Sequence, residues 1–290
     1  HHHLWHWKKF PWLAAPMTPK MYGDDYSGLR QDYLVEDLRK DFGDNNIVKS
    51  VHVQANFDPI HPVEETKWLQ SEADRAGFPH AIVGDATMTN PDINEVFEGH
   101  AKFPNIRGIR HQLHFWEGDS LRCRTDRPDL CLTDEFQRSV ALLKTFNMHF
   151  ELQGFSHQFV HFAELLRNHP DINFCLVHGG MLTSDDESTV IAWKQGLEHL
   201  EPFPNCWIKC SGLNFFTAKC DIDHMRIVLD HVLDRFGADR CFYGSNFPLE
   251  KLWARYDDLV DACKEILTTR SESEQRSFFH DTAAKFYRLS

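Results

Sequence analysis

The chain alternates between short apolar runs and longer amphipathic stretches. Eight runs rich in β-branched and aromatic residues predict strands at His1–Trp7, Ile47–Ala55, His80–Met88, Ile106–Leu113, His149–Phe155, Phe174–Gly180, Cys206–Leu213 and Cys241–Pro248. Apolar residues at helical spacing predict helices at Glu64–Ala76, Pro91–His100, Thr133–Phe146, Val160–Asn168, Ser184–Leu200, Asp223–Phe236 and Leu252–Thr268. The tail Ser271–Ser290 is expected to form a closing helix.

Strands that alternate with helices indicate a parallel sheet and an α/β protein. Eight of them at regular spacing favour a closed (β/α)8 barrel of the TIM type, as a single domain over residues 1–290. The alternative is another α/β sheet, but a Rossmann sheet would need a GxGxxG motif after its first strand, which the sequence lacks.

Two inserts interrupt the alternation. The segment Trp12–Gly28 is long and contains Pro16 and Pro19, with Pro11 directly before it. The segment Phe115–Thr133 is long and polar. Because the second insert follows a predicted strand, it is expected on the face of the barrel where such enzymes carry their active sites.

The charge balance narrows the range of partners. The formal net charge is -12, which argues against nucleic acid, because phosphate binding needs clustered basic residues. No apolar run approaches the length of a membrane span. A small-molecule substrate fits best, and a few arginines in a pocket could still bind an anion. The composition is compatible with a monomer or a homodimer.

The sequence has eight cysteines, and several of them lie in apolar strand-like runs. A free cysteine there behaves as a small hydrophobic residue, so we expect reduced thiols and a cytoplasmic protein. Four disulfides are the alternative that the even count leaves open.

His1 and His3 share one face of the first predicted strand, because alternate side chains of a strand point the same way. Two imidazoles at a barrel mouth suit one divalent metal ion, with zinc favoured. The alternative is the remnant of a purification tag, although the sequence that follows does not read as a linker.

Several motifs in a fixed order resemble the amidohydrolase family. They are HxHxW from His1, VHVQA at Val51–Ala55, IRGIR at Ile106–Arg110, VHGG around His178 and GSNFP around Asn246. The branch with fuconolactonases and pyrone-dicarboxylate hydrolases is the most similar, and the resemblance covers essentially the whole chain. It implies a distorted (β/α)8 barrel, and an aspartate two positions ahead of His1.

The resemblance also implies roles for two strand-end residues. His178 would ligate a metal together with His1 and His3, or polarise a carbonyl. Asn246 stands where many relatives have an aspartate that binds metal or accepts a proton from water. Since asparagine is neutral and not a base, either another carboxylate acts or the enzyme is metal-independent, as some relatives in this branch are.

Glu151 is the candidate substitute carboxylate, with a salt-bridged structural glutamate as the alternative. Arg110 is expected to hold an anionic substrate group. Further side chains at strand ends or in the second insert are expected to bind substrate, and they are His52, Gln54, Arg124, Gln153 and His157.

These features predict hydrolysis of a small lactone that bears a carboxylate or a sugar-acid group, with water attacking the ring carbonyl. His178, alone or with the first-strand pair or its metal, would stabilise the oxyanion. Two alternatives stay open: a metal-dependent decarboxylase of an aromatic acid, and a barrel that binds a ligand without catalysis.

Overall fold

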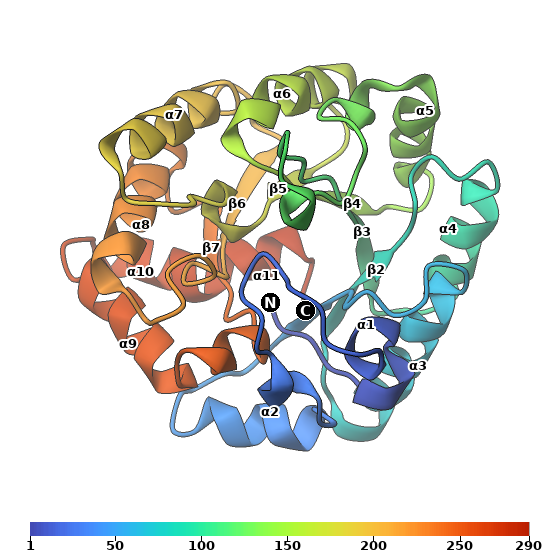
Figure 1. Cartoon of the computed structure of the whole chain (residues 1–290), viewed down its shortest axis with the longest axis horizontal. Helices are drawn as coiled ribbons and strands as arrows, with labels where there is room; N and C mark the ends of the chain where they lie inside the picture. The colour runs from blue at the N-terminus through green and yellow to red at the C-terminus, as the bar shows by residue number, and fades with distance from the viewer. Residues whose placement is uncertain (290) are drawn as a thin grey trace.

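The computed structural model describes residues 1–289, so the predicted last residue of the tail helix, Ser290, lies outside the described residues. Parallel strands form one seven-stranded sheet in chain order, which curls around the centre of the molecule (Figure 1). The strands are β1 (Val51–Val53), β2 (Ala81–Asp85), β3 (Ile106–Gln112), β4 (His149–Gln153), β5 (Phe174–Leu176), β6 (Cys206–Cys210) and β7 (Cys241–Tyr243). The predicted α/β barrel is confirmed.

The N-terminal segment occupies the place of an eighth strand. The predicted strand His1–Trp7 is wrong in extent, because only His2 bridges the sheet, to His52 of β1 on one side and to Phe247 after β7 on the other, while Trp5 bridges Tyr33 outside the sheet. The His2 amide donates to Val51 O (3.0 Å), and the His3 amide donates to Phe247 O (2.7 Å). The segment therefore closes a distorted barrel before the chain turns into a 3-10 turn at Trp7–Lys9.

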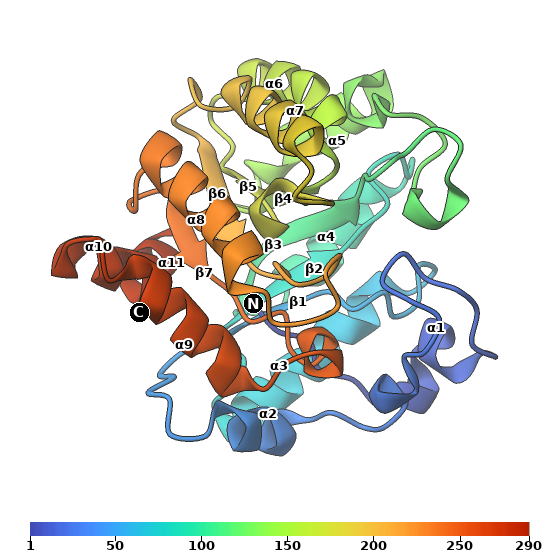
Figure 2. The same ribbon diagram turned by 60° about the vertical axis from the view of Figure 1, so that its left-hand side comes forward.

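Helices surround the sheet, as Figure 2 shows from the side. The principal ones are α3 (Pro62–Ala76), α4 (Ile93–Ala101), α5 (Asp134–Leu143), α6 (Phe159–Asn168), α7 (Glu187–Glu198), α8 (Ile222–Phe236) and α9 (Tyr256–Leu267). Each corresponds to a predicted helix, and α5, α7 and α9 are shorter at both ends than predicted. The sequence reading missed α2 (Val35–Phe42), whose buried side chains Val35, Leu38 and Phe42 recur at i, i+3 and i+7 over only two turns.

The tail closes the amino-terminal end of the barrel, which we call the floor. It is not one helix: α10 (Glu272–Arg276) and α11 (Thr282–Phe286) are separated by a π-helical turn at Ser277–Asp281. The ring of Phe286 packs against Trp207 of β6 and Phe242 of β7. The C-terminal residues are thus part of the barrel core.

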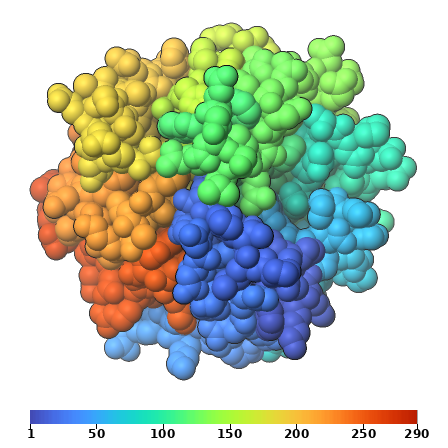
Figure 3. Space-filling model, in the orientation of Figure 1, coloured from blue at the N-terminus to red at the C-terminus, as the bar shows by residue number. Residues whose placement is uncertain are grey.

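The two inserts cover the opposite end, the mouth. Short α1 (Pro11–Ala14) lies in the first of them, and Trp5 and Trp12 meet there edge to face with ring centroids 5.7 Å apart. In Figure 3 the N-terminal segment (blue) and the second insert (green) adjoin over the middle of the molecule. Arg122 lies over the Trp116 ring (5.0 Å), which ties the second insert together.

All eight cysteines are unpaired, in agreement with the expectation of free thiols. Within residues 1–289, no helix combines the length and the apolar character that crossing a bilayer requires.

Candidate active site

A cavity opens at the mouth, where the strands end. Its walls come from strand ends and from both inserts, and they are His3, Trp5, Trp12, Met21, Tyr22, Gln54, Ala55, Asn56, Arg110, Gln112, His114, Arg124, Gln153, His178, Phe215, Asn246 and Leu249. Ligands of (β/α)8 enzymes bind at this carboxyl face of the strands. The cavity combines aromatic walls with a few polar groups, as small-molecule sites do.

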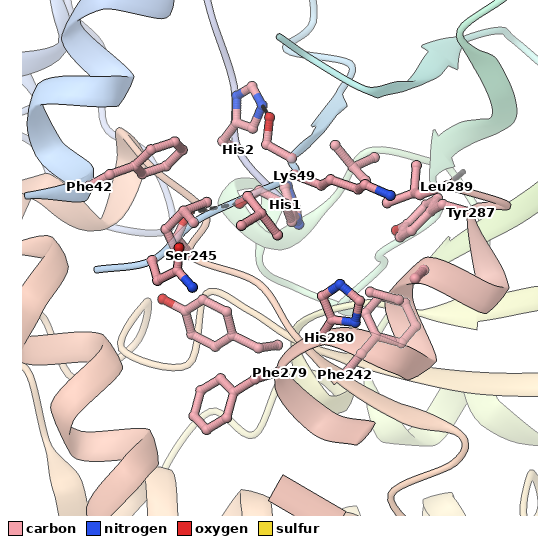
Figure 4. A pocket seen from close by; sticks show the side chains of 18 of the residues that line it. His1, His2, Phe42, Lys49, Phe242, Ser245, Phe279, His280, Tyr287 and Leu289 are labelled. Carbon is pink, nitrogen blue, oxygen red and sulfur yellow. Dashed lines mark hydrogen bonds between the residues drawn. The ribbon is translucent and has the colours of Figure 1, made fainter. Parts of the chain in front are cut away.

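A larger cavity, of about 280 Å3, lies at the floor (Figure 4). Its walls include the residues that lead into β1, such as Lys49, together with Tyr287 and Leu289 from the tail. Because enzymes of this architecture use the other face, we place the candidate active site at the mouth.

Three histidines form one hydrogen-bonded group: His3 and His178 line the mouth cavity, and His1, beneath them, lines the floor cavity. His1 Nε2 lies 3.2 Å from His3 Nε2. Ser211 Oγ lies 3.1 Å from His1 Nδ1 and 3.1 Å from His178 Nδ1. The serine hydroxyl can therefore accept from one ring and donate to the other, which links His178 to the first-strand pair.

Backbone carbonyls fix which nitrogen carries the hydrogen in two of these rings. His3 Nδ1 donates to Val53 O (2.7 Å), and His178 Nδ1 donates to Ser211 O (3.0 Å). Burial lowers the pKa of both histidines well below 6.5, so the rings are neutral at pH 7. Each neutral ring then keeps a lone pair on Nε2, which is the state that a general base needs.

Left-handed backbone places two of the functional side chains. His178 has a φ of 58° and Asn246 a φ of 55°, both uncommon for residues other than glycine. Gly212, with a φ of 61°, allows the close approach: a Cβ there would lie 2.6 Å from His178 Nδ1 and 3.1 Å from Asn246 Nδ2. Such strain concentrates at functional sites, where the surrounding structure holds it in place.

Arg110 supplies a buried cation to the cavity. It is 2% exposed, and its Nη2 donates to Gln54 O (2.6 Å). Within residues 1–289 no carboxylate lies within ion-pairing distance of it, and its Nε has no hydrogen-bond partner. Burial lowers the pKa of Arg110, and the more distant carboxylates raise it by a smaller amount. A guanidinium nevertheless stays charged. The group is placed to bind an anion.

The structure brings most of the predicted binding residues to the cavity wall. Gln54, Gln153 and Arg124 line it, together with Arg110. Gln112 Nε2 donates to Gln153 Oε1 (3.3 Å), so amides from β3 and β4 form a polar wall.

Glu151 lies away from this cavity, within the barrel towards the floor. Its oxygens accept from Lys209 Nζ (2.7 and 2.6 Å) and from Tyr287 Oη (2.7 Å), and the side chain has no exposed surface. Burial raises the pKa of Glu151, but the Lys209 ammonium outweighs this and leaves the pKa well below its ordinary value. The expectation of Glu151 as a base is therefore not supported, and the salt-bridged alternative fits the geometry.

His52 and His157 also lie outside the wall of the cavity. His52 Nδ1 accepts from Leu4 N (3.1 Å) and Nε2 donates to Glu65 Oε1 (3.3 Å), so the ring fastens the N-terminal segment to α3. His157 Nε2 donates to Phe115 O (2.9 Å) and holds the second insert. Both contacts are structural.

Sequence reading missed several residues that line the cavity. Gln112 shares a face of β3 with Arg110, two positions earlier, so strand alternation could have identified it. His114 follows the same strand. Tyr22 and Phe215, whose rings meet at 5.1 Å, come from separate loops, and no local pattern in the sequence signals their meeting.

The histidines fit a metal ion only in part. Two nitrogens on one zinc lie about 3.4 Å apart, from bond lengths of about 2.0–2.1 Å in a tetrahedron. The 3.2 Å between His1 Nε2 and His3 Nε2 suits such a pair. However, no set of three His, Cys, Asp or Glu side chains within the described part of the chain could hold a metal, so His178 does not complete the predicted site. Catalytic zinc sites use three protein ligands, and this donor set is incomplete.

Known proteins resemble this chain over its full length. The amidohydrolase family model (Amidohydro_2) matches residues 1–289. An uncharacterized protein of Sinorhizobium fredii is 36% identical, covering 100% of this chain and 97% of its own length. An L-fucono-1,5-lactonase of Burkholderia multivorans is 27% identical, over 100% of this chain and 95% of the lactonase.

A crystal structure of an amidohydrolase from Burkholderia multivorans, with bound zinc, has the same fold. It superposes with a TM-score of 0.84 at 24% identity and covers 100% of this chain and 98% of that one. The fold and the full-length family match agree with the geometry at the mouth, and the chain is a hydrolase that belongs to the amidohydrolase family.

Proposed function

We propose that this enzyme hydrolyses a small lactone that carries a carboxylate. The observation that carries the proposal is the buried, unpaired guanidinium of Arg110 in the same cavity as the neutral imidazole of His178. The first group binds an anion and the second accepts a proton, and hydrolysis of an anionic ester needs both. The similarity to an L-fucono-1,5-lactonase supports the same substrate class.

The reaction follows from the protonation states. His178 Nε2 takes a proton from water as the water oxygen attacks the ring carbonyl carbon. In the tetrahedral intermediate, hydrogen-bond donors of the cavity stabilise the oxyanion. The ring C–O bond then breaks, and protonated His178 returns the proton to the leaving oxygen. The product is a hydroxy acid, and the enzyme returns to its starting state.

Arg110 and the amide wall divide recognition between them. The guanidinium offers the geometry for a carboxylate. Gln54, Gln112 and Gln153 both donate and accept hydrogen bonds, which suits hydroxyl groups. Trp12 and Tyr22 add flat apolar surface at the rim. This combination favours a sugar-acid lactone over an uncharged one.

A bound divalent ion would polarise the carbonyl, and His1 and His3 are the residues that would hold it. Because residues 1–289 offer no third protein ligand, we propose that turnover does not depend on a metal. Dialysis against a chelator is expected to leave turnover within about twofold of the untreated enzyme, and a loss that zinc restores would contradict this.

The test of the function is proton release in weak buffer, with carbon dioxide swept out, across lactones that do and do not carry a carboxylate. Acid release with the carboxylated lactones, lost by about 100-fold or more in His178→Gln, is the expected result. Proton uptake with an aromatic acid would instead identify a decarboxylase. No turnover across the panel would leave ligand binding without catalysis.

A further inference from the structure

A histidine at the end of β3 lines the mouth cavity, and the proposed reaction does not use it. His114 lies two positions after Gln112 and four after Arg110, and all three residues line the cavity. The pairing of β3 with β4 continues to this point, since Leu113 N donates to Gln153 O (3.0 Å). Alternate side chains therefore still share one face, and His114 is the outermost of the three.

The surroundings of His114 fix its position. Arg124 N donates to His114 O (2.8 Å), so the second insert returns to the strand end at this residue. Gln158 Nε2 donates to the carbonyl of the preceding residue, Leu113 (2.8 Å). The His114 ring meets Phe155 edge to face, with ring centroids 6.1 Å apart. With a side chain only 1% exposed, the ring is held by packing on a fixed backbone.

The two ring nitrogens of His114 have different surroundings. Nδ1 is buried and forms no hydrogen bond with residues 1–289, whereas Nε2 faces the cavity. Burial lowers the pKa of the ring to about 3, and the charges of Arg124 and Arg110 act in the same direction, so the ring is neutral at pH 7. A neutral ring carries one hydrogen, and a buried N–H without an acceptor is rarer in proteins than an acceptor without a donor. The hydrogen therefore lies on Nε2, and the ring is a donor to the cavity.

Arg124, whose backbone contacts His114, also lines the cavity. Its guanidinium forms no ion pair with residues 1–289, although its neighbours Arg122 and Arg127 each have an aspartate partner. Its charge acts on the His114 ring more strongly than that of Arg110 does. An N–H donor and an unpaired cation at one wall form a site for an anionic oxygen.

The amides of the wall also present donors. Gln54 Oε1 accepts from Asn56 N (2.7 Å), and Gln153 Oε1 accepts from Gln112 Nε2 (3.3 Å). The Nε2 groups of Gln54 and Gln153 form no hydrogen bond with residues 1–289 and remain for a ligand. The wall thus offers mainly donors, and its ligand must bring acceptors.

We propose that His114 is a specificity-determining residue that donates a hydrogen bond from Nε2 to an anionic oxygen of the substrate, beside the guanidinium of Arg124. A carboxylate accepts from both groups, whereas a carboxamide has an NH2 in place of one acceptor. A neutral ring adds a donor to this wall without adding a further charge to repel the arginines. The kinetic effect rests on the proposed lactonase function, but the binding of a carboxylate at this wall does not.

The kinetics of His114→Phe and His114→Gln measure the contact. Phenylalanine keeps a ring against Phe155 and removes the donor, and glutamine restores an N–H near the place of Nε2. For a carboxylated lactone, His114→Phe should raise KM by about 10-fold and leave kcat within about twofold, because the bond is made equally in the ground state and in the transition state. His114→Gln should recover most of the affinity. A fall in kcat with an unchanged KM would overturn the proposal, since it would place the ring at the reacting carbonyl.

His111→Phe is the matched control. His111 lies on the other face of β3, where its Nδ1 accepts from Met88 N (3.3 Å) and its ring stacks on Phe136. Burial lowers its pKa as well, to about 4. This variant should leave KM within about twofold of the wild type, because its ring does not line the cavity. A rise in KM as large as that of His114→Phe would indicate a general effect on β3 and count against the contact.

NMR of the histidine ring nitrogens tests the donor without turnover. In the wild type at pH 7, the His114 ring should carry its hydrogen on Nε2. Sodium acetate should shift its signals, acetamide at the same concentration should not, and Arg124→Met should weaken the acetate effect by about 10-fold. A hydrogen on Nδ1, or ring signals that acetate leaves unchanged, would contradict the proposal. This titration also decides the matter if His114→Phe does not fold.

The two measurements separate this proposal from the function itself. If no lactone is hydrolysed, the proposed function fails, while the acetate titration still decides the role of His114. If a carboxylated lactone is hydrolysed but His114→Phe keeps the KM of the wild type, the function stands and the role of His114 fails.

Discussion

The two ends of the barrel interior treat buried charge in opposite ways. At the floor, Glu151 and Lys209 neutralise each other at 2.6 Å, and Tyr287 completes the group. At the mouth, Arg110 is nearly as buried but has no carboxylate within ion-pairing distance among residues 1–289. The charges of an ion pair neutralise each other without a ligand, whereas an unpaired buried cation is neutralised only when an anionic ligand binds. The contrast therefore separates charge that belongs to the fold from charge that serves binding.

Breaking the floor pair should give the largest effect. Lys209→Met leaves the Glu151 carboxylate buried without its cation, and we expect a loss of about 3–5 kcal/mol in the free energy of unfolding. Urea unfolding measures this loss. Adding Glu151→Leu should recover most of it, because neither half of the floor pair then remains as a buried charge. A double variant no more stable than the single one would contradict the assignment of this pair as a compensated unit.

Removing the cation at the mouth should lower activity rather than the free energy of unfolding. Arg110→Met is expected to keep or raise the free energy of unfolding, because it deletes an unpaired buried charge. It should lower kcat/KM for a carboxylated lactone by about 100-fold, in line with about 2–5 kcal/mol for truncating a buried charged contact. A lactone without the carboxylate is the control substrate and should lose much less. A stability loss as large as that of Lys209→Met would remove the distinction between the two ends.

The same contrast extends to pH, through two buried glutamates. The pKa of Glu65, near the mouth, is raised by burial to about 8 from 4.5, so the folded state holds a proton that the unfolded state releases. Its contribution to stability is full below pH 4.5 and is lost as pH rises through about 8, with a slope of at most about 1.4 kcal/mol per pH unit. Glu65→Gln should flatten this slope in unfolding measured between pH 5 and 8.

Glu151 should behave in the opposite sense. Its lowered pKa gives stability that is present above 4.5 and is lost as pH falls. Acid unfolding therefore tests the floor, and alkaline weakening tests the mouth. A Glu65→Gln protein with the pH dependence of the wild type would show that Glu65 is ionised in the folded state.

The smallest effect concerns the backbone at the mouth. Gly212→Ala and Gly118→Ala both place a side chain at positive φ, at a cost of about 1 kcal/mol each. At Gly118 the new Cβ would meet nothing within 4 Å, whereas at Gly212 it would press on His178. Gly212→Ala should therefore lose more stability than Gly118→Ala, and only Gly212→Ala should lose turnover. Equal activities would mean that the close approach to His178 is not needed.

Local patterns explain which parts of this picture could be predicted. The fully buried strands and amphipathic helices follow from periodicity, and alternation along β3 places Arg110 at the cavity. The residues His1–Trp7 predict a full strand, but after His2 the segment forms no β-bridge to β1 or to the residues after β7, and Trp5 bridges Tyr33 instead. The pattern does not encode where a continuous run leaves the sheet.

The role of Glu151 could not be settled from its position on a strand. Whether an inward carboxylate is a base or half of an ion pair depends on partners 58 and 136 residues away, Lys209 and Tyr287. Sequence reading finds chemically capable residues, whereas only the fold decides which charges are already neutralised.

The place of Tyr287 also bears on how the protein is made. Its hydroxyl bonds to Glu151, and the neighbouring Phe286 fills the base of the barrel, so the core is incomplete until both residues have left the ribosome. Nascent chains that end before these residues would leave apolar strand ends, and the Glu151–Lys209 pair, exposed to solvent. We therefore expect chaperones to bind such chains, and we expect the barrel to close only after Phe286 and Tyr287 have been made.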